Sequence, residues 1–190
     1  SYGGSGPCDN AYQQTVNDVT AAGALVVVAA GNSAEPVTRP ADCTGVVAVG
    51  AVRGDGAKTS YSSYGPNVAL AVPGGSGSTG ADAGLLTTLN AGRTVPVAHT
   101  YESLVGTSFA APLVAGTAAL MLSVQPGLTP ADLTRLLKAS VRPHTAQPNL
   151  PTCSATALSQ AVCNCTTTTC GAGLLDAQLA LLAATPVVLP

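Results

Sequence analysis

The sequence predicts an α/β fold, a three-layer sandwich in which helices flank a central parallel sheet. Three short apolar runs predict the sheet, "ALVVVAA" (24–30), "GVVAVGAV" (45–52) and "VALAVPG" (68–74). Continuous apolar runs of this length are typical of strands buried on both faces of a parallel sheet. Helical patterns lie before the first run and after the third, and strands that alternate with helices favour the α/β class.

The composition fits one globular domain with an aliphatic core. The 190 residues are 46% hydrophobic and only 8% charged, with a formal net charge of −2. The usual charged share is about 25%. No run of basic residues is present, so neither nucleic acid nor a membrane is an expected partner. With no Trp and one Phe, the core must consist of Val, Leu and Ala.

Helix signals define the remaining elements. A first helix is expected from a cap at Asp9 or Asn10 to Gly23. Its apolar stripe comprises Tyr12, Val16 and Val19. In "LTPADLTRLLKAS", Thr129 is the cap and Pro130 the first helical residue. The inward positions of that helix are Leu133, Leu136 and Leu137. "GGSGSTGADAG" (74–84) reads as a surface loop, 141–172 as a long Cys-rich loop, and "LLDAQLALLAA" as a closing helix.

The stretch "GTSFAAPLVAG" (106–116) opens a further helix that runs to about Val124. It is apolar on every face, which predicts a buried core helix, and it is too short to argue for a membrane span. Ser108 lies at its N-terminus, where backbone N–H groups favour negative charge. On this pattern alone, a helix cap is the commoner explanation of Ser108 and a nucleophile the rarer one.

Six cysteines suit three disulfides in an oxidising compartment. They are Cys8, Cys43, Cys153, Cys163, Cys165 and Cys170. A zinc site in "CNCTTTTC" is the alternative, although its spacing matches no common zinc knuckle and neither histidine is near it. The chain opens at "SYGG" without a Met, which suggests processing or cleavage.

Three segments in order, "VVVAAGN", "RPADCTGVVAVGAV" and "GTSFAAPLVAG", resemble the subtilisin-like serine proteases, the subtilases. "SYGGSG" resembles the substrate-binding strand of that family, and "SYSSYGPNVALAVPGG" resembles its approach to the serine. The likeness covers nearly the whole chain. It implies the subtilisin-like fold and a secreted, extracellular serine endopeptidase made as a zymogen. The Cys-rich tail is similar to that of secreted bacterial subtilases with disulfide-bonded extensions.

The resemblance implies that Ser108 is the nucleophile and that Asn32 donates to the oxyanion. Asn32 follows a buried strand at its carboxyl end, where α/β sheets place ligands. The alternative for Asn32 is a simple turn residue. The residues implied to bind substrate are Ser1, Tyr2, Gly3, Ala29, Ala30, Gly31, Thr38 and Thr107.

A serine nucleophile needs a base and an orienting carboxylate. Neither the D-T/S-G nor the H-G-T motif of the family is present. His99 and His144 are weak candidates for the base. We therefore expect residues 1–190 to be the C-terminal part of one peptidase domain, with a Cys-rich insertion at about 141–172. The Asp and His would come from an N-terminal part, the expected partner beside polypeptide substrates.

The resemblance also implies a cis bond at Arg39–Pro40, in a segment that lines the primary specificity pocket. Small residues on both walls, with Thr38 at the floor, predict a preference for apolar or medium-sized side chains. Glu35 is the only carboxylate expected near this pocket. The chemistry requires no cofactor or metal. Calcium is common in the family, but Val68, Ala69 and Leu70 stand where one site often has an Asp, so structural calcium is expected only in the missing part.

Adjacent parallel strands should bring the start of the first helix and the start of the second strand to one end of the sheet. This predicts a Cys8–Cys43 disulfide. The other four cysteines allow three connectivities. An adjacent Cys163–Cys165 pair would be strained, which favours two bridges that cross this segment.

Two other functions stay open. In sedolisin-like acid peptidases, which have a similar G-T-S motif, an Asp takes the oxyanion role, whereas this chain has Asn32. A pseudo-protease would keep a peptide-binding groove without the base. Motifs for Asp and His upstream of this chain would decide between catalysis and binding.

Overall fold

The computed structural model describes residues 2–77 and 82–186 and has the predicted fold class. A five-stranded sheet has the order β1-β2-β3-β7-β6, in which β6 alone is antiparallel to its neighbour. The strands are β1 (Val26–Ala29), β2 (Val46–Val52), β3 (Val68–Pro73), β6 (Val141–Arg142) and β7 (Leu174–Leu175). The three predicted apolar runs are β1, β2 and β3, so continuous apolarity correctly indicated the parallel part of the sheet.

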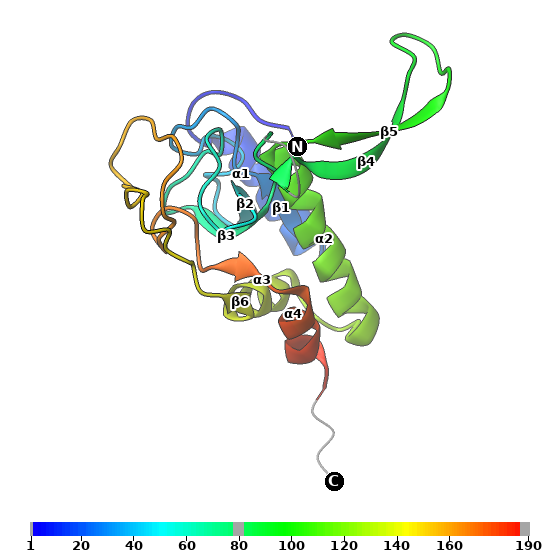
Figure 1. Ribbon diagram of the computed structural model, residues 1–190. Coiled ribbons are helices and arrows are strands. Elements are labelled where there is room, and N and C mark those ends of the chain that lie inside the picture. The colour runs from blue at the N-terminus through cyan, green and yellow to red at the C-terminus, as the bar shows by residue number, and fades with distance from the viewer. Residues whose placement is uncertain (1, 78–81, 187–190) are drawn as a thin grey trace.

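Helices cover both faces of this sheet (Figure 1). They are α1 (Asn10–Ala21), α2 (Thr107–Val124), α3 (Pro130–Ala139) and α4 (Ala177–Ala184). Side chains alternate along β1: Val27 and Ala29 pack into the cluster that contains α2 and α4. Val26 belongs to a second cluster and lines the cavity beside α1. Alternate residues of a strand point to opposite faces, which gives the three layers.

The helix termini follow the sequence signals. The Asp9 carboxylate caps α1 by accepting from the N–H groups of Ala11 and Tyr12. Thr129 and Asp132 form a reciprocal capping box at the start of α3, with Pro130 in the first turn. Gly23 has a φ of 90°, as expected of a glycine just past a helix end.

Three expectations for the helices were wrong. Helix α2 is not buried on every face, since Leu113 and Leu120 are 42% and 51% exposed. Val19 of the predicted α1 stripe is exposed, because α1 contacts the sheet mainly through Val16. The closing helix begins at Ala177, because Leu174 and Leu175 form β7 and Asp176 caps α4.

Helix α2 is the one helix in the described ranges that is long and apolar enough to cross a membrane, judged by length and composition alone. Its buried side includes Ala110, Val114 and Met121, which pack with β2 and β3 in the main core. This packing is that of a core helix with one side uncovered.

The sequence did not predict a β-hairpin that projects from the body (Figure 1). It consists of β4 (Leu85–Asn90) and β5 (His99–Leu104), paired antiparallel from Leu85–Leu104 to Asn90–His99. In the predicted loop at 74–84, the Ser76 N–H donates to the Asp82 carbonyl (2.9 Å), while residues 78–81 lie outside the described residues.

All six cysteines form disulfides, and Cys8–Cys43 is confirmed. The expected crossing bridges in the tail are wrong, since the pairs are Cys153–Cys163 and Cys165–Cys170. Backbone contacts bring these pairs together: the Cys153 N–H donates to the Asn164 carbonyl in a parallel β-bridge, and the Cys170 N–H donates to the Thr166 carbonyl in a turn.

Candidate functional site

The carboxyl end of β1 meets the N-terminus of α2, and this junction holds both residues expected to carry the chemistry. After β1, the Ala30 N–H donates to the Val49 carbonyl (3.0 Å), which keeps the strand in the sheet up to Ala30. The Gly31 N–H then donates to the Thr107 hydroxyl (3.2 Å). The segment that carries Asn32 is therefore attached to the first turn of α2.

Asn32 and Thr107 form what we call the Asn32 clamp. The Asn32 side-chain oxygen Oδ1 accepts from the Thr107 N–H (3.0 Å) and from the Thr107 hydroxyl (2.9 Å). A backbone N–H can only donate, so its partner must be the oxygen of the amide. The orientation of the amide is thereby fixed, and its nitrogen Nδ2 points away from Thr107.

Gly106 places this nitrogen and Ser108 at the same corner. Gly106 is the residue before α2, with a φ of 146° that favours glycine. A Cβ at Gly106 would lie 3.6 Å from Asn32 Nδ2. Ser108 is a half-buried residue of the first turn of α2 rather than its cap, because Gly106 occupies the cap position.

Tyr61 contacts the Gly74–Gly75 segment, which is hydrogen-bonded to Gly106 at the start of α2. Its hydroxyl lies 2.8 Å from the Gly74 carbonyl oxygen and 2.6 Å from the Gly75 carbonyl oxygen, and its one proton is shared between them. Burial raises the pKa of the Tyr61 phenol, which keeps this donor protonated. The Gly106 N–H donates to the Gly74 carbonyl (3.0 Å), so Tyr61 and Gly106 bind the same oxygen.

The predicted substrate segment lies beside the Arg39 segment. The Gly4 N–H donates to the Arg39 carbonyl and the Arg39 N–H to the Gly6 carbonyl, both at 3.1 Å. The Arg39–Pro40 bond is cis, as expected. Tyr2 and Thr38 are exposed. Ser1 lies outside the described residues.

Glu35 is not the only carboxylate in this region. Asp9 Oδ2 lies 2.7 Å from the Arg39 guanidinium, while its other oxygen caps α1. Arg39 also lies over the ring of Tyr12, 5.4 Å from the ring centroid. The Asp9 charge is compensated by Arg39 and is thus a poor partner for a basic substrate side chain.

The other predicted substrate residues differ in exposure. Ala29 and Gly31 are half-buried, and Ala30 is buried. Thr107 is fully buried and its hydroxyl belongs to the Asn32 clamp. Direct substrate contact by the Thr107 side chain therefore does not fit this structure.

Neither histidine is placed beside the serine. His99 pairs with Asn90 at the outer end of the projecting hairpin, while Ser108 follows its base. His144 lies in the Cys-rich part of the chain, where its Nε2 is 2.9 Å from the Gly171 carbonyl oxygen. The chain thus presents a serine at a helix N-terminus and an oriented amide donor, but no histidine base for that serine.

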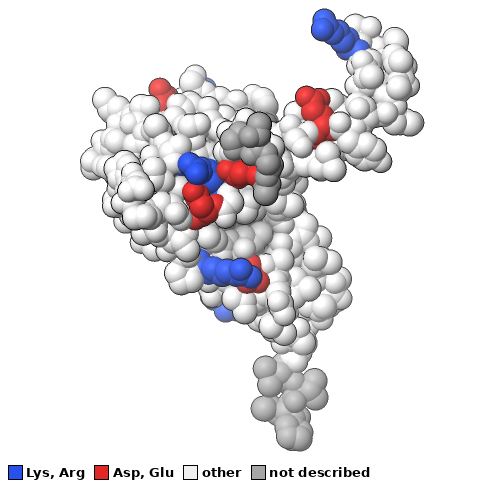
Figure 2. All heavy atoms as spheres, in the orientation of Figure 1, with Lys and Arg blue, Asp and Glu red and all other residues white. Residues whose placement is uncertain are grey.

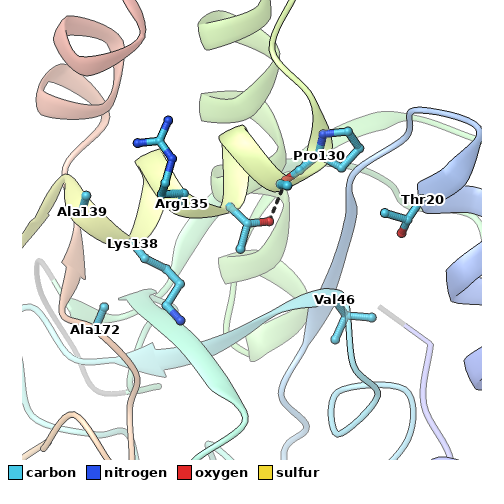
Figure 3. A pocket seen from close by; sticks show the side chains of 10 residues that line it. Thr20, Val46, Pro130, Arg135, Lys138, Ala139 and Ala172 are labelled. Carbon is cyan, nitrogen blue, oxygen red and sulfur yellow. Dashed lines mark hydrogen bonds between the residues drawn. The ribbon is translucent and has the colours of Figure 1, made fainter.

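The two cavities described lie away from this corner. A cavity of about 730 Å³ opens below the sheet between α3, the end of α1 and the start of β2. Figure 3 shows Lys138 reaching down from α3 between Ala172 and Val46, with Arg135 turned away. A second cavity of about 330 Å³ lies between α1, β1 and Pro40.

Charged side chains are sparse on the face of the molecule in Figure 2, and near its centre blue and red side chains lie next to each other. Among the described residues, Arg53 pairs with Asp55 (2.8 Å) and Arg142 with Asp176 (2.6 Å). The Cys153, Cys165 and Cys170 sulfurs lie close enough together to hold a metal. All three are in disulfides, so they offer no thiolate ligands.

Sequence reasoning missed the loop that lies behind Asn32. Ser62 and Ser63 lie in the segment that resembles the family's approach to the serine, but their contact with the Asn32 segment was not predicted: the Ser63 N–H donates to the Gly31 carbonyl (2.9 Å). Lys58 precedes this loop and is only 1% exposed. A lone lysine between Ala57 and Thr59 in a chain this poor in charge was the available signal.

Comparisons with known proteins agree with this arrangement. A family model described as the subtilase family matches residues 1–169. An extracellular protease of Xanthomonas campestris pv. campestris is 41% identical over 187 residues, 97% of this chain and 28% of that protein. An extracellular basic protease of Dichelobacter nodosus is 38% identical over 143 residues, 72% of this chain and 22% of that protein.

A solved protease structure from Pseudoalteromonas arctica superposes with a TM-score of 0.80 at 37% identity. The match covers 97% of this chain and 50% of that one. The chain therefore spans about a quarter of the length of these curated relatives and half of the solved protease.

Proposed function

The chain belongs to the subtilase family, and from this premise we propose that it is the nucleophile-bearing part of a secreted serine endopeptidase. In this proposal, Ser108 attacks the peptide carbonyl and forms an acyl-enzyme, and Asn32 donates to the oxyanion. Polypeptides are the substrates, with a preference for apolar or medium-sized side chains. Residues 1–190 are the C-terminal part of one peptidase domain, with a Cys-rich insertion at about 141–172.

The observation that carries the proposal is the Asn32 clamp. An oxyanion donor must be oriented before charge develops, because reorganisation during the reaction would consume its benefit. Thr107 fixes the Asn32 amide through two hydrogen bonds to Oδ1. A side chain that served only as a turn residue would not need its oxygen held by the residue next to a serine.

The base and its carboxylate come, in this proposal, from an N-terminal part of the same protease. Both histidines of this chain lie elsewhere, in the hairpin and the Cys-rich loop. Two features support such a partner: β1 is an edge strand of the described sheet, and α2 exposes the apolar Leu113 and Leu120. Bare strand edges are normally paired or covered.

The remaining partners and conditions follow from the same proposal. Three disulfides and relatives named extracellular proteases support secretion. The chemistry requires no cofactor, and structural calcium belongs to the N-terminal part. Neither nucleic acid nor a membrane is a proposed partner.

The test uses the full-length protease, with this chain and the part that supplies Asp and His. We expect it to hydrolyse casein and to react with a fluorophosphonate probe at Ser108. Ser108→Ala should abolish both, by a factor on the order of 10⁶ in kcat as for the subtilisin nucleophile, a family member. Circular dichroism should show an unchanged fold.

Two outcomes would contradict the proposal. Casein hydrolysis with a pH optimum near 4 would point to a sedolisin-like mechanism. A full-length sequence without Asp and His motifs, together with an unreactive Ser108, would establish a peptide-binding pseudo-protease.

A further inference from the structure

Lys58 is a buried cation that the proposed chemistry does not use. Its side chain is 1% exposed. None of the carboxylates in the described ranges forms an ion pair with it. Nζ donates instead to the carbonyl oxygens of Thr59 (2.9 Å) and Ser62 (2.8 Å) and lies 5.5 Å from the centroid of the Tyr64 ring. An uncompensated buried charge is unfavourable, so its retention calls for a reason.

Both carbonyl partners of Lys58 belong to residues 59–64, which we call the bracing loop. The Ser62 hydroxyl accepts from the Ala51 N–H of β2 and donates to the Ser63 carbonyl, both at 2.9 Å. The Lys58 ammonium and the Ser62 hydroxyl thus hold the bracing loop from inside. The carbonyl oxygens of Thr59, Ser62 and Ser63 and the Ser62 hydroxyl are thus hydrogen-bonded inside the protein. Their three residues are at most 3% exposed.

The outer side of the bracing loop contacts the residues on either side of Asn32. The Ser63 N–H donates to the Gly31 carbonyl (2.9 Å). The Ser63 and Ser33 hydroxyls are 3.0 Å apart, and the Ala34 N–H donates to the Tyr61 carbonyl (2.8 Å). Any Cβ at Gly31 would lie 3.0 Å from the Ser63 hydroxyl, so the two segments are in close contact.

We propose that Lys58 is a positioning residue for the oxyanion donor, because it holds the bracing loop against Gly31 and Ser33. Thr107 fixes the side-chain amide of Asn32, and the bracing loop fixes the backbone that carries it. The inference rests on the proposed function, since it assigns Lys58 a role in the reaction of Ser108. Lys58 touches neither the serine nor the amide and acts only through the loop.

The role does not require a charged lysine. Burial lowers the pKa of Lys58 to about 8. A neutral amine still has two N–H donors, the number that the Thr59 and Ser62 carbonyls accept. The positioning effect therefore persists above pH 8, whereas a side chain without donors would leave two buried carbonyls unpaired.

The experiment compares Lys58→Met in the full-length protease with Lys138→Met, a change of the chain's other lysine on exposed α3. Lys58→Met should lower kcat about tenfold, less than the 10²–10³ lost when an oxyanion donor is removed. KM should stay within about twofold, because the donor acts on the transition state rather than the bound substrate. Lys138→Met should change neither constant.

The decisive step repeats Lys58→Met in an Asn32→Ala background. If Lys58 acts through Asn32, its removal should have no further effect on kcat there. An equal fall in both backgrounds, or an unchanged kcat in the wild-type background, would overturn the inference.

Ser63→Ala provides a second route if Lys58→Met does not fold. It removes the hydroxyl contact to Ser33 and should lower kcat in the wild-type background but not beside Asn32→Ala. An unchanged kcat would overturn the inference. The two failures can be told apart. If the wild-type protease showed no hydrolysis dependent on Ser108, the proposed function would be wrong, and this inference with it. If the wild type were active and the variants unaffected, only this inference would be wrong.

Discussion

The β4–β5 hairpin ends at Leu104, just before Thr107 of the Asn32 clamp, yet the two regions are held in opposite ways. Asn32 is fixed by Thr107 on one side and lies beside the bracing loop on the other. The hairpin starts and ends near the Gly106–Gly74 hydrogen bond (3.0 Å), but its Leu86 and Tyr101 are 72% and 71% exposed. Hydrogen-bonded support is therefore concentrated at the proposed oxyanion donor, and it ends at Gly106.

The largest effect that tests this contrast is expected from Asn32→Ala. In the full-length protease, kcat should fall by about 10²–10³, or about 2.7–4 kcal/mol, a magnitude known for the equivalent residue of subtilisin. KM measured with a chromogenic peptide should stay within about twofold. Gln at this position, with the same amide on a longer arm, should not restore kcat. A restored rate would mean that the clamp geometry is unimportant.

A second effect concerns the Cys8–Cys43 disulfide, whose loop contains Asn32 of the clamp. Cys8 and Cys43 are separated by 35 residues and Cys165 and Cys170 by 5. By the chain-entropy relation, loss of the first bridge should cost about 3–4 kcal/mol of unfolding free energy and loss of the second about 2. Urea unfolding of the two double Cys→Ser variants checks this order. Equal losses would show that the chain length enclosed by each bridge does not decide its contribution.

A third effect is the contribution of the buried Lys58 to the pH dependence of the unfolding free energy. Its pKa of about 8 in the fold is below that of an unfolded lysine, so the unfolded state binds more protons between these two values. The unfolding free energy should therefore rise with pH by about 2–3 kcal/mol between pH 7 and pH 10 from this group. The wild-type curve minus the Lys58→Met curve isolates it, because other groups such as Tyr61 cancel. A difference that stays flat with pH would contradict the lowered pKa.

The smallest effect is expected from the hairpin. Residues 91–98 can be replaced by Asn-Gly between the paired Asn90 and His99, a turn suited to two antiparallel strands. The kcat/KM for a short chromogenic peptide should stay within about twofold, because no part of the Asn32 clamp lies in the hairpin. A large loss would show that the contrast between the two regions is false.

The same contrast separates what the sequence predicts from what it does not. Local apolar runs predicted strands β1 to β3, and polar residues before helical patterns predicted the caps Asp9 and Thr129. The order of the strands predicted the Cys8–Cys43 bridge. The hairpin was missed because "LLTTLNAG" has only weak alternation and few β-branched residues. The tail disulfides depend on turn geometry that spacing does not encode.

Within the site, a motif predicted roles for Ser108, Asn32 and Thr107, while the clamp contacts of Thr107 and the contacts of Lys58 needed the structure. The Thr107 hydroxyl lies inside the clamp and not toward substrate because Asn32, 75 residues earlier, supplies its acceptor. Lys58 is separated from Gly31 by three steps of hydrogen bonding through the bracing loop. Such long-range contacts leave no periodic signal in a single sequence.

The arrangement of the three disulfides also sets an order of events during oxidative folding. The two tail bridges span 10 and 5 residues, so their thiols meet through local chain motion, on the timescale of about 10–100 ns for closing a short loop. In the folded chain Cys8 lies beside Cys43 where α1 packs on β1 and β1 pairs with β2. An oxidised Cys8–Cys43 bridge therefore reports that this half of the sheet has assembled, whereas oxidised tail cysteines report nothing beyond their own turns.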